Sequence, residues 1–247
     1  MIKTVDIYNN DFRKGDKLYR SFSTRIESIF GSEQSISDVL LYEQYDENGN
    51  ASALILNSSG SFIVLVDPGS DVDEIGDFIC ACAFSSVLSN VPLPIGSSEN
   101  SGYVMHCCVK PKPYISADFV ETQEVGKIHR LLKENFDNVP EFPLWYADML
   151  HRIRRKTAVL VGSKNGSEIV SSATCSFITD DSAIINCVCT SPDHRKKGLA
   201  CDCINRILCY LTEREVGNAF VFCRKKMLSF YENRGFENIG EWYEYLR

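Results

Sequence analysis

The stretch HRKKGLA, residues 194–200, decides which fold this chain is expected to adopt. An apolar run, AIINCVC at residues 183–189, precedes it and is typical of a buried strand. After it, apolar residues recur at helical spacing over residues 199–213, which predicts an amphipathic helix. Ser-Pro-Asp at 191–193 and Gly198 allow a sharp turn between the two. Because the first amides of a helix lack intrahelical partners and lie at the positive end of its dipole, this unit predicts a site for a phosphorylated ligand.

The composition is that of a globular protein with one large domain or two small ones. The chain has 247 residues, 44% of them hydrophobic and 24% charged. A net charge of −7 argues against nucleic acid as a partner, because phosphate binding needs clustered cations. The basic run at residues 152–156 ends an expected helix, where cations complement the dipole. We find no apolar segment of about 20 residues, as a membrane span needs, and no signal-peptide core, so no membrane partner is expected.

Cysteine is abundant, but its spacing does not favour a metal site. The chain has 11 cysteines, an odd number, and no C-x-x-C motif. We therefore expect no metal, and thiols used as small apolar residues in a reducing cytoplasm.

Two breaker-rich stretches divide the chain near residue 112. They are residues 91–101 and the KPKP run at 110–113. Before them, three strands are expected at 39–45, 51–56 and 62–66, then a helix from about Ser70 and an apolar run at 83–88. After them the pattern predicts two helices, three strands with the loop and helix above, a strand, a short helix and a last strand. The predicted domains are residues 1–112 and 113–247, with a mixed α+β fold.

The C-terminal part resembles the GNAT family of N-acetyltransferases. Arg195-x-x-Gly198-x-Ala200 matches the family signature Arg/Gln-x-x-Gly-x-Gly/Ala, and Tyr231 with Gly235-Phe236 is similar to its closing Tyr-x-x-x-Gly-Phe element. The resemblance extends over residues 114–247. It implies the acyl-CoA N-acyltransferase fold for residues 113–247, with acetyl-CoA as co-substrate.

The N-terminal part repeats the same order of elements without the cofactor loop. At the corresponding turn, residues 66–71, there is no arginine and there are two acids, Asp67 and Asp71, which would repel a pyrophosphate. We interpret residues 1–112 as a degenerate copy of the GNAT fold; an unrelated α+β cap domain is the alternative.

The resemblance also assigns roles to individual residues. The amides of the loop would hold the pyrophosphate, the strand before it would pair with the pantetheine arm, and a main-chain N–H near Val188 would polarise the thioester carbonyl. Tyr231 would be the general acid that protonates the departing thiolate. The cofactor-binding residues expected in this way are Cys187, Val188, Cys189, Arg195, Lys196, Lys197, Gly198, Leu199, Ala200 and Arg224. A nucleophilic Cys187 or Cys189 is disfavoured, because no adjacent base is evident.

Two positions depart from the family pattern. Arg224 stands where members often have an asparagine that contacts the cofactor, and Ala183 stands where some members have a glutamate as general base. Another group must then deprotonate the amine. The chemically suitable candidates are Glu141, Asp148, His151 and Glu241.

The preferred hypothesis is an acetyl-CoA-dependent N-acetyltransferase acting on a small-molecule amine or a peptide amino terminus, as a monomer or homodimer. The alternative is a non-catalytic CoA-binding regulatory module. A nucleotide-binding enzyme ranks last, because the G-x-x-x-x-G-K-[ST] spacing is missing. The aromatic residues Trp145, Tyr146, Trp242 and Tyr243, with nearby acids, point to a cationic acceptor, although surface aromatics and acids are common.

Overall fold

The computed structural model describes residues 1–5, 15–32 and 39–247. The chain forms two compact units: Met1–Met105 with Phe222–Arg247, and His106–Val221. The chain therefore leaves the first unit close to the breaker-rich region, but its last segment returns to that unit. The assignment of residues 113–247 to a single domain stays a prediction. Within the described residues, no helix combines the length and apolar character that crossing a bilayer would demand.

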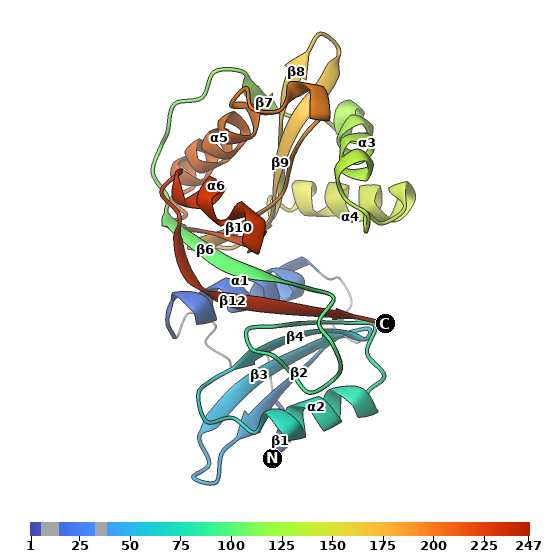
Figure 1. Ribbon diagram of the computed structural model, residues 1–247, viewed down its shortest axis with the longest axis vertical. Coiled ribbons are helices and arrows are strands. Elements are labelled where there is room, and N and C mark those ends of the chain that lie inside the picture. Colours follow the sequence, from blue (N-terminus) through green and yellow to red (C-terminus); the bar gives the residue numbers. More distant parts are fainter. Residues whose placement is uncertain (6–14, 33–38) are drawn as a thin grey trace. The chain divides into compact units, whose positions relative to one another are not determined.

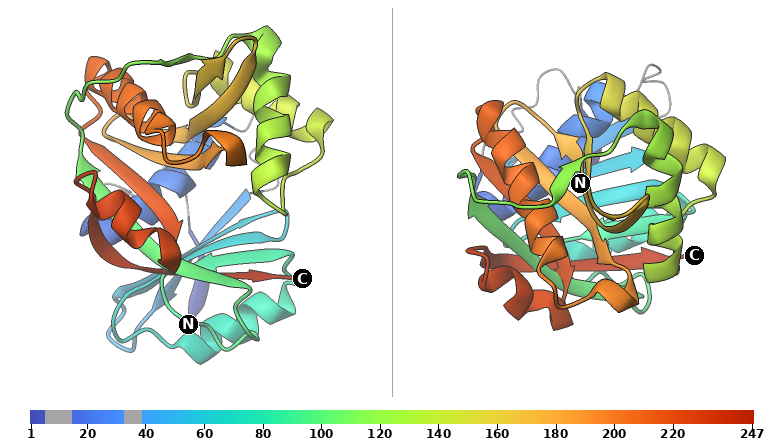
Figure 2. Two further views of the ribbon diagram at one scale, coloured as in Figure 1. Left: turned by 45° about the horizontal axis from the view of Figure 1, so that its top comes forward. Right: turned by 90° about the horizontal axis from the view of Figure 1, so that it is seen from above.

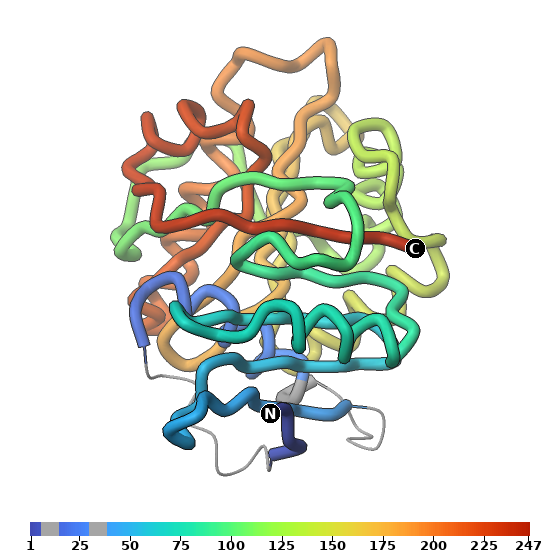
Figure 3. Tube along the Cα trace, turned by 60° about the horizontal axis from the view of Figure 1, so that its bottom comes forward, coloured from blue at the N-terminus to red at the C-terminus, as the bar shows by residue number. Residues whose placement is uncertain are grey.

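The first unit contains a meander of antiparallel strands followed by a parallel strand (Figure 1). Its strands are β1 (Ile2–Thr4), β2 (Val39–Tyr45), β3 (Ala51–Ser58), β4 (Ser61–Val66), β5 (Ser86–Ser89) and β12 (Glu237–Leu246). Neighbours from β1 to β4 are antiparallel, whereas β5 lies parallel to β4. The last strand, β12, pairs antiparallel with β5, and Figure 3 shows the C-terminal segment alongside it.

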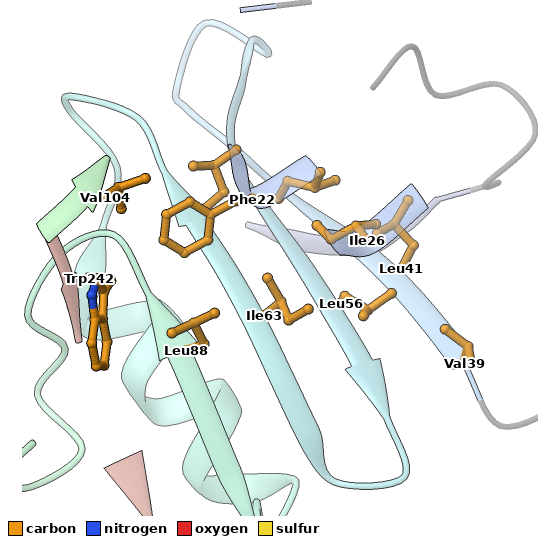
Figure 4. Packing of buried hydrophobic residues seen from close by; sticks show 11 residues of the cluster. Phe22, Ile26, Val39, Leu41, Leu56, Ile63, Leu88, Val104 and Trp242 are labelled. Atoms are coloured by element: carbon orange, nitrogen blue, oxygen red, sulfur yellow. The ribbon is translucent and has the colours of Figure 1, made fainter. Parts of the chain in front are cut away.

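Helices cover the two faces of this sheet. On one face lies α1 (Lys17–Ser32), whose Phe22 and Ile26 are fully buried in a cluster with Leu56 (Figure 4). On the other lies α2 (Val72–Ala81), which buries Ile75 and Ile79. Asp71 caps α2 by accepting a hydrogen bond from the Glu74 amide at 3.0 Å, as expected for an acid at a helix start.

The second unit has a mixed sheet, in the order β11-β10-β9-β8-β7. Its strands are β7 (Ala117–Phe119), β8 (Val159–Asn165), β9 (Glu168–Ile178), β10 (Ser182–Thr190) and β11 (Asn218–Arg224). Pairing is antiparallel from β7 to β10 and parallel between β10 and β11. Two strands, β11 and β6 (Asn100–Cys108), span the division between the units.

Helices cover both faces of this sheet as well (Figure 2). Buried apolar residues of α3 (Val125–Asn135) and α4 (Phe142–Arg154) form one cluster with residues of β8, β9 and β10. The opposite face is covered by α5 (Leu199–Glu213), which fully buries Cys203, Ile204, Ile207, Leu208 and Leu211. The observed bounds of α5 are those predicted from its apolar spacing.

Both units thus repeat one order of elements: three antiparallel strands, a helix, and a strand parallel to the third. It is β2-β3-β4-α2-β5 in the first unit and β8-β9-β10-α5-β11 in the second. The fold is mixed α+β, as the sequence predicts. The short helix α6 (Leu228–Glu232) precedes β12.

Candidate functional site

Strands β10 and β11 separate shortly after they begin. Their parallel pairing runs from Ser182 opposite Asn218 to Ile184 opposite Phe220, while β10 continues to Thr190. Beyond Ile184, β10 is no longer paired with β11. An extended ligand can pair with such an edge as an added strand would.

A β-bulge interrupts β10 on its other side, in the same stretch. The register with β9 passes from Asn186 opposite Thr174 to Cys189 opposite Ser172, so that it shifts by one residue over Cys187 and Val188. Cys187 adopts a φ of 50°, a left-handed conformation that is uncommon for a residue with a side chain. Such conformations cluster at functional sites. The bulge lies at the residues where the resemblance to the GNAT family leads us to expect the thioester carbonyl.

The loop after β10 is anchored at its beginning. The Ser191 amide donates to the Val170 carbonyl at 2.8 Å, and the His194 ring lies 3.0 Å from the Asn165 side-chain amide. Arg195 donates from Nε to the Thr190 carbonyl at 3.1 Å and from Nη2 to Asn135 Oδ1 at 2.9 Å. These contacts hold residues 191–195 against the sheet and the end of α3.

The second half of the loop has no comparable internal contacts. Among the described residues, we find no hydrogen bond from a main-chain amide of residues 196–200 to another protein group. Lys196 and Gly198 have φ values of 62° and 83°, and Gly198 is the N-cap of α5. A Cβ atom built on Gly198 would meet nothing within 4 Å. The amides at this helix start are therefore available to an anion.

The charge around the loop is basic. Arg195, Lys196 and Lys197 are exposed, and Lys197 Nζ donates to the Asp193 carbonyl at 3.1 Å. The acid in the first turn of α5, Asp202, accepts hydrogen bonds from the amides of Ile115, Ser116 and Ala117. These donors offset the negative charge that would otherwise oppose an anion at the helix start.

The thiol of Cys189 is poorly suited to nucleophilic attack. It is 7% exposed and packs in the cluster beneath α3 and α4. Burial raises its pKa to about 11, more than the contact with the Ser172 hydroxyl lowers it. A protonated thiol is a weak nucleophile, so the geometry also disfavours an acyl-cysteine at this position.

Two other expected site residues belong to the first unit. Tyr231, on α6, is 5% exposed and makes edge-on ring contacts with Phe230 at 5.0 Å and Phe236 at 5.6 Å. Arg224 is exposed at the end of β11. The loop itself lies within the second unit.

The four candidate bases differ in their surroundings. Glu141 accepts a hydrogen bond from Lys133 at 2.9 Å, which lowers the pKa of its carboxyl. Asp148 accepts two hydrogen bonds from Arg152 Nε, at 2.9 and 3.0 Å. Glu241 accepts from the Tyr243 hydroxyl, which raises the pKa of that tyrosine to about 12. The fourth, His151, is half-buried on α4, and Ala183, the family's glutamate position, is fully buried.

The tryptophans expected beside the acceptor are core residues instead. Trp145 is 9% exposed and packs against the His129 ring, and Trp242 is 7% exposed and donates from its indole nitrogen to the Cys223 carbonyl at 3.1 Å. Trp145 and Trp242 therefore give no support to the prediction of a cationic acceptor. Across the part of the chain that the structure describes, no group of three or more His, Cys, Asp or Glu side chains gathers as a metal site would require.

Sequence reasoning missed Asn135 and Asp202. Asn135 accepts from Arg195 across 60 residues of chain, and Asp202 binds amides about 85 residues away. No local sequence motif predicts partners so far away along the chain. The acidic residue in the first turn of α5 was the one available signal.

Comparisons with known proteins agree with this geometry. Residues 124–236 match the model of the Acetyltransferase (GNAT) family. No curated protein matches the chain.

Several solved structures are similar over most of the chain. A GCN5-related N-acetyltransferase from Sphaerobacter thermophilus has a TM-score of 0.62 at 13% identity, covering 90% of this chain and 84% of its own. One from Kribbella flavida has a TM-score of 0.59 at 13% identity, covering 91% and 93%. A tandem GNAT protein from the clavulanic acid biosynthesis pathway has a TM-score of 0.53 at 13% identity, covering 90% and 86%. The chain therefore has the GNAT fold, and its residues 124–236 form an acetyltransferase domain of the GNAT family.

Proposed function

We propose that this protein transfers the acetyl group of acetyl-CoA directly to a primary amine, either of a small molecule or of an amino terminus. The observation that carries the proposal is the set of main-chain amides at residues 196–200, which have no internal hydrogen-bond partner among the described residues and lie at the start of α5. Acetyl-CoA supplies an activated acyl group as a thioester. The chain must hold this anion, polarise its carbonyl and move two protons.

The loop residues bind the pyrophosphate in this proposal. Amides from Lys196 to Ala200 donate to it, the side chains of Lys196 and Lys197 add positive charge, and Gly198 keeps the approach open. Arg195 has a second role in this proposal. Two of its N–H groups bond to Thr190 and Asn135, so its main task is to brace the loop.

The bulged part of β10 polarises the carbonyl. A main-chain N–H near Val188 donates to the carbonyl oxygen as negative charge develops there, and Cys187 and Cys189 line the arm through their backbone. Removing one donor of this kind costs about 10²–10³ in rate in other enzymes. Because the donor is main chain, no side chain at these positions identifies it.

Proton transfer falls to Tyr231 and a base. Tyr231 donates its phenolic proton to the departing thiolate. Among the candidate bases, Glu141 is ion-paired with Lys133, which lowers the pKa of its carboxyl and makes it a weaker proton acceptor, and Asp148 is ion-paired with Arg152. This favours His151 or Glu241 for the amine proton, and Arg224 remains the candidate for a further contact to the cofactor.

The test combines binding with turnover. Gly198→Asn keeps a residue that tolerates positive φ but places a side chain where the anion would approach. Gly166→Asn is the matched control, since Gly166 has a φ of 61° and equally open surroundings at the turn between β8 and β9. Calorimetry should show that acetyl-CoA binds about tenfold or more weakly to Gly198→Asn, and unchanged to Gly166→Asn.

Turnover is measured as thiol release from acetyl-CoA with a panel of primary amines. Amine-dependent release supports the transferase. Binding without release for any amine would instead support the non-catalytic CoA-binding module. Equal binding by both glycine variants would remove the assigned pyrophosphate site.

A further inference from the structure

The first unit contains a cavity of about 300 Å³ that the proposed acetyl transfer does not use. Its walls come from the start of α1, the end of β4 and the segment after β5. They include the apolar side chains of Leu18, Leu65 and Val91, the ring of Tyr19, and two acids, Asp16 and Asp67. This volume lies at the lower end of the range of small-molecule sites.

The cavity lies at the position in the fold where β4 and β5 separate. Their parallel pairing ends at Val64 opposite Ser89, and β4 continues to Val66. In the second unit, the pairing of β10 and β11 ends at Ile184 opposite Phe220, and there both strands continue, β11 as far as Arg224. In each unit, the two parallel strands therefore stop pairing before the first of them ends.

In the first unit, a side chain bonds to β4 beyond the last pair. Asn90 accepts a hydrogen bond from the Val66 amide at 2.8 Å and donates one to the Val66 carbonyl at 2.9 Å. These are the main-chain groups with which an extended ligand would pair. The equivalent residue of the second unit follows Phe220 and is Val221, whose side chain makes no hydrogen bonds. The first unit is thus closed to a pantetheine arm.

The charge at the cavity also opposes an acyl-CoA. Asp16 and Asp67 are both exposed residues, and partial burial, with the nearby charge of Asp16 as the second cause, raises the pKa of the Asp67 carboxyl. Asp16 accepts a hydrogen bond from the Tyr19 amide at 2.8 Å. Within the described residues, the Asp67 carboxylate has no ion-pair or hydrogen-bond partner, and neither acid has a cationic side-chain partner. A positive ligand would relieve the repulsion between the two carboxylates.

We propose that this cavity binds a small organic cation, an ammonium group on an apolar body, in place of the cofactor that the second unit binds. The ammonium group lies between Asp16 and Asp67, and the apolar body packs on Leu18, Leu65 and Val91. A bare divalent ion fits less well. Calcium takes six to eight oxygen ligands, whereas the described walls offer two carboxylates, the Tyr19 hydroxyl and the Asn90 amide, whose oxygen already accepts from the Val66 amide. The site is independent of acetyl transfer.

The test uses 4-fluorobenzylammonium as the probe and fluorine NMR as the readout, without acetyl-CoA. The neutral 4-fluorobenzyl alcohol has nearly the same shape. The cation should bind the wild type about tenfold or more tightly than the alcohol does, and Asp67→Asn should lose about tenfold or more of that affinity. Asp16→Asn, which retains the ability to cap α1, should lose affinity as well. Asp77→Asn, an exposed acid on α2, removes the same charge elsewhere in the unit and should bind like the wild type.

Two results would overturn the proposal. One is equal affinity of the wild type and Asp67→Asn for the cation, with both proteins folded by circular dichroism, because the cation would then bind elsewhere. The other is that the organic cation does not bind, whereas calcium or CoA binds with an affinity that Asp67→Asn changes. Since acetyl transfer is measured separately, neither result bears on the proposed function.

Discussion

Three residues around the proposed cofactor site have a left-handed backbone: Cys187, Lys196 and Gly198. For the two with side chains this conformation costs of order 1–2 kcal/mol each. The cost is offset by the packing of β10 and α5 on either side. The tight loop leaves the main-chain amides of residues 196–200 without an internal hydrogen-bond partner among the described residues, which is what an anion-binding loop requires.

Tyr231→Phe tests the proton donor. The ring contacts with Phe230 and Phe236 remain, so the fold should be retained. Without the hydroxyl, kcat should fall by about tenfold or more, which is about 1.4 kcal/mol of barrier, while acetyl-CoA affinity changes little. Steady-state thiol release and calorimetry measure the two quantities. A kcat within about twofold of the wild type would remove the general-acid role.

Alkylation of the thiols tests whether Cys189 is a nucleophile. Because its pKa is raised to about 11, the group is a neutral thiol at lower pH, and only about one in a thousand molecules carries the reactive thiolate at about pH 8. Iodoacetamide should modify the exposed Cys80, Cys82 and Cys108 first, and Cys189 faster as the pH rises toward 11. Peptide mass spectrometry reports each site, and unfolded protein controls for intrinsic reactivity. Fast labelling of Cys189 at neutral pH would indicate a reactive thiolate and would support an acyl-cysteine mechanism.

At the residue scale, the sequence predicted main-chain features better than side-chain partners. The sharp turn predicted at Gly198 is confirmed by its φ of 83° at the start of α5, while the cofactor contacts of Gly198 and Ala200 stay predictions. The bracing role of Arg195 was not, because its partner Asn135 lies on α3, and nothing local to residue 195 specifies that pairing. Trp145 was misplaced for a similar reason. Whether an aromatic residue faces a groove or a core depends on the helix that covers it.

At the scale of elements, Asp202 joins α5 to the segment that leads into β7. Its carboxylate accepts from three successive amides, including that of Ala117 at 2.8 Å. Asp202→Asn removes the charge and one acceptor, so the free energy of unfolding should fall by about 1–3 kcal/mol. Asp193→Asn, an exposed acid of the neighbouring loop, is the control and should change it by less than about 0.5 kcal/mol. Denaturant titration compares the two variants, and equal effects would contradict the role of Asp202.

Most elements with strong periodicity were predicted, α1 being an exception, and the two shortest strands were not. The helix over residues 199–213 and the strand at residues 39–45 have their predicted bounds. The three-residue strands β1 and β7 are too short to show alternation. Helix α1 was missed although Leu18, Phe22, Ile26 and Ile29 follow helical spacing. The bulge in β10 has no sequence signal, because it arises from how two strands pair.

At the scale of the whole molecule, the end of the chain stabilises the beginning. Tyr243 to Leu246 pair with Ser89 to Ser86, and Tyr245 is 4% exposed within the core beside α2. The sequence could not predict this pairing. Strand partners far apart in sequence are fixed by the assembled sheet, and the aromatic pattern of the last strand suits either half equally well.

Tyr245→Phe tests how much the last strand contributes to the first unit. The Tyr245 hydroxyl accepts from the Leu93 amide at 2.8 Å and donates to the Leu93 carbonyl at 3.3 Å. The variant keeps the ring but leaves a buried N–H unpaired, which should cost about 1–3 kcal/mol of unfolding free energy. Tyr243→Phe is the control on the same strand, because its hydroxyl bonds only to the nearby Glu241 among the described contacts. Hydrogen exchange should quicken at β5 and residues 90–93 in Tyr245→Phe, and not at β8 or β9, since β5 and β12 unfold together. Faster exchange confined to β8 and β9 would mean instead that β12 stabilises the second unit. The pairing of β12 with β5 would then contribute nothing measurable to the stability of the first unit.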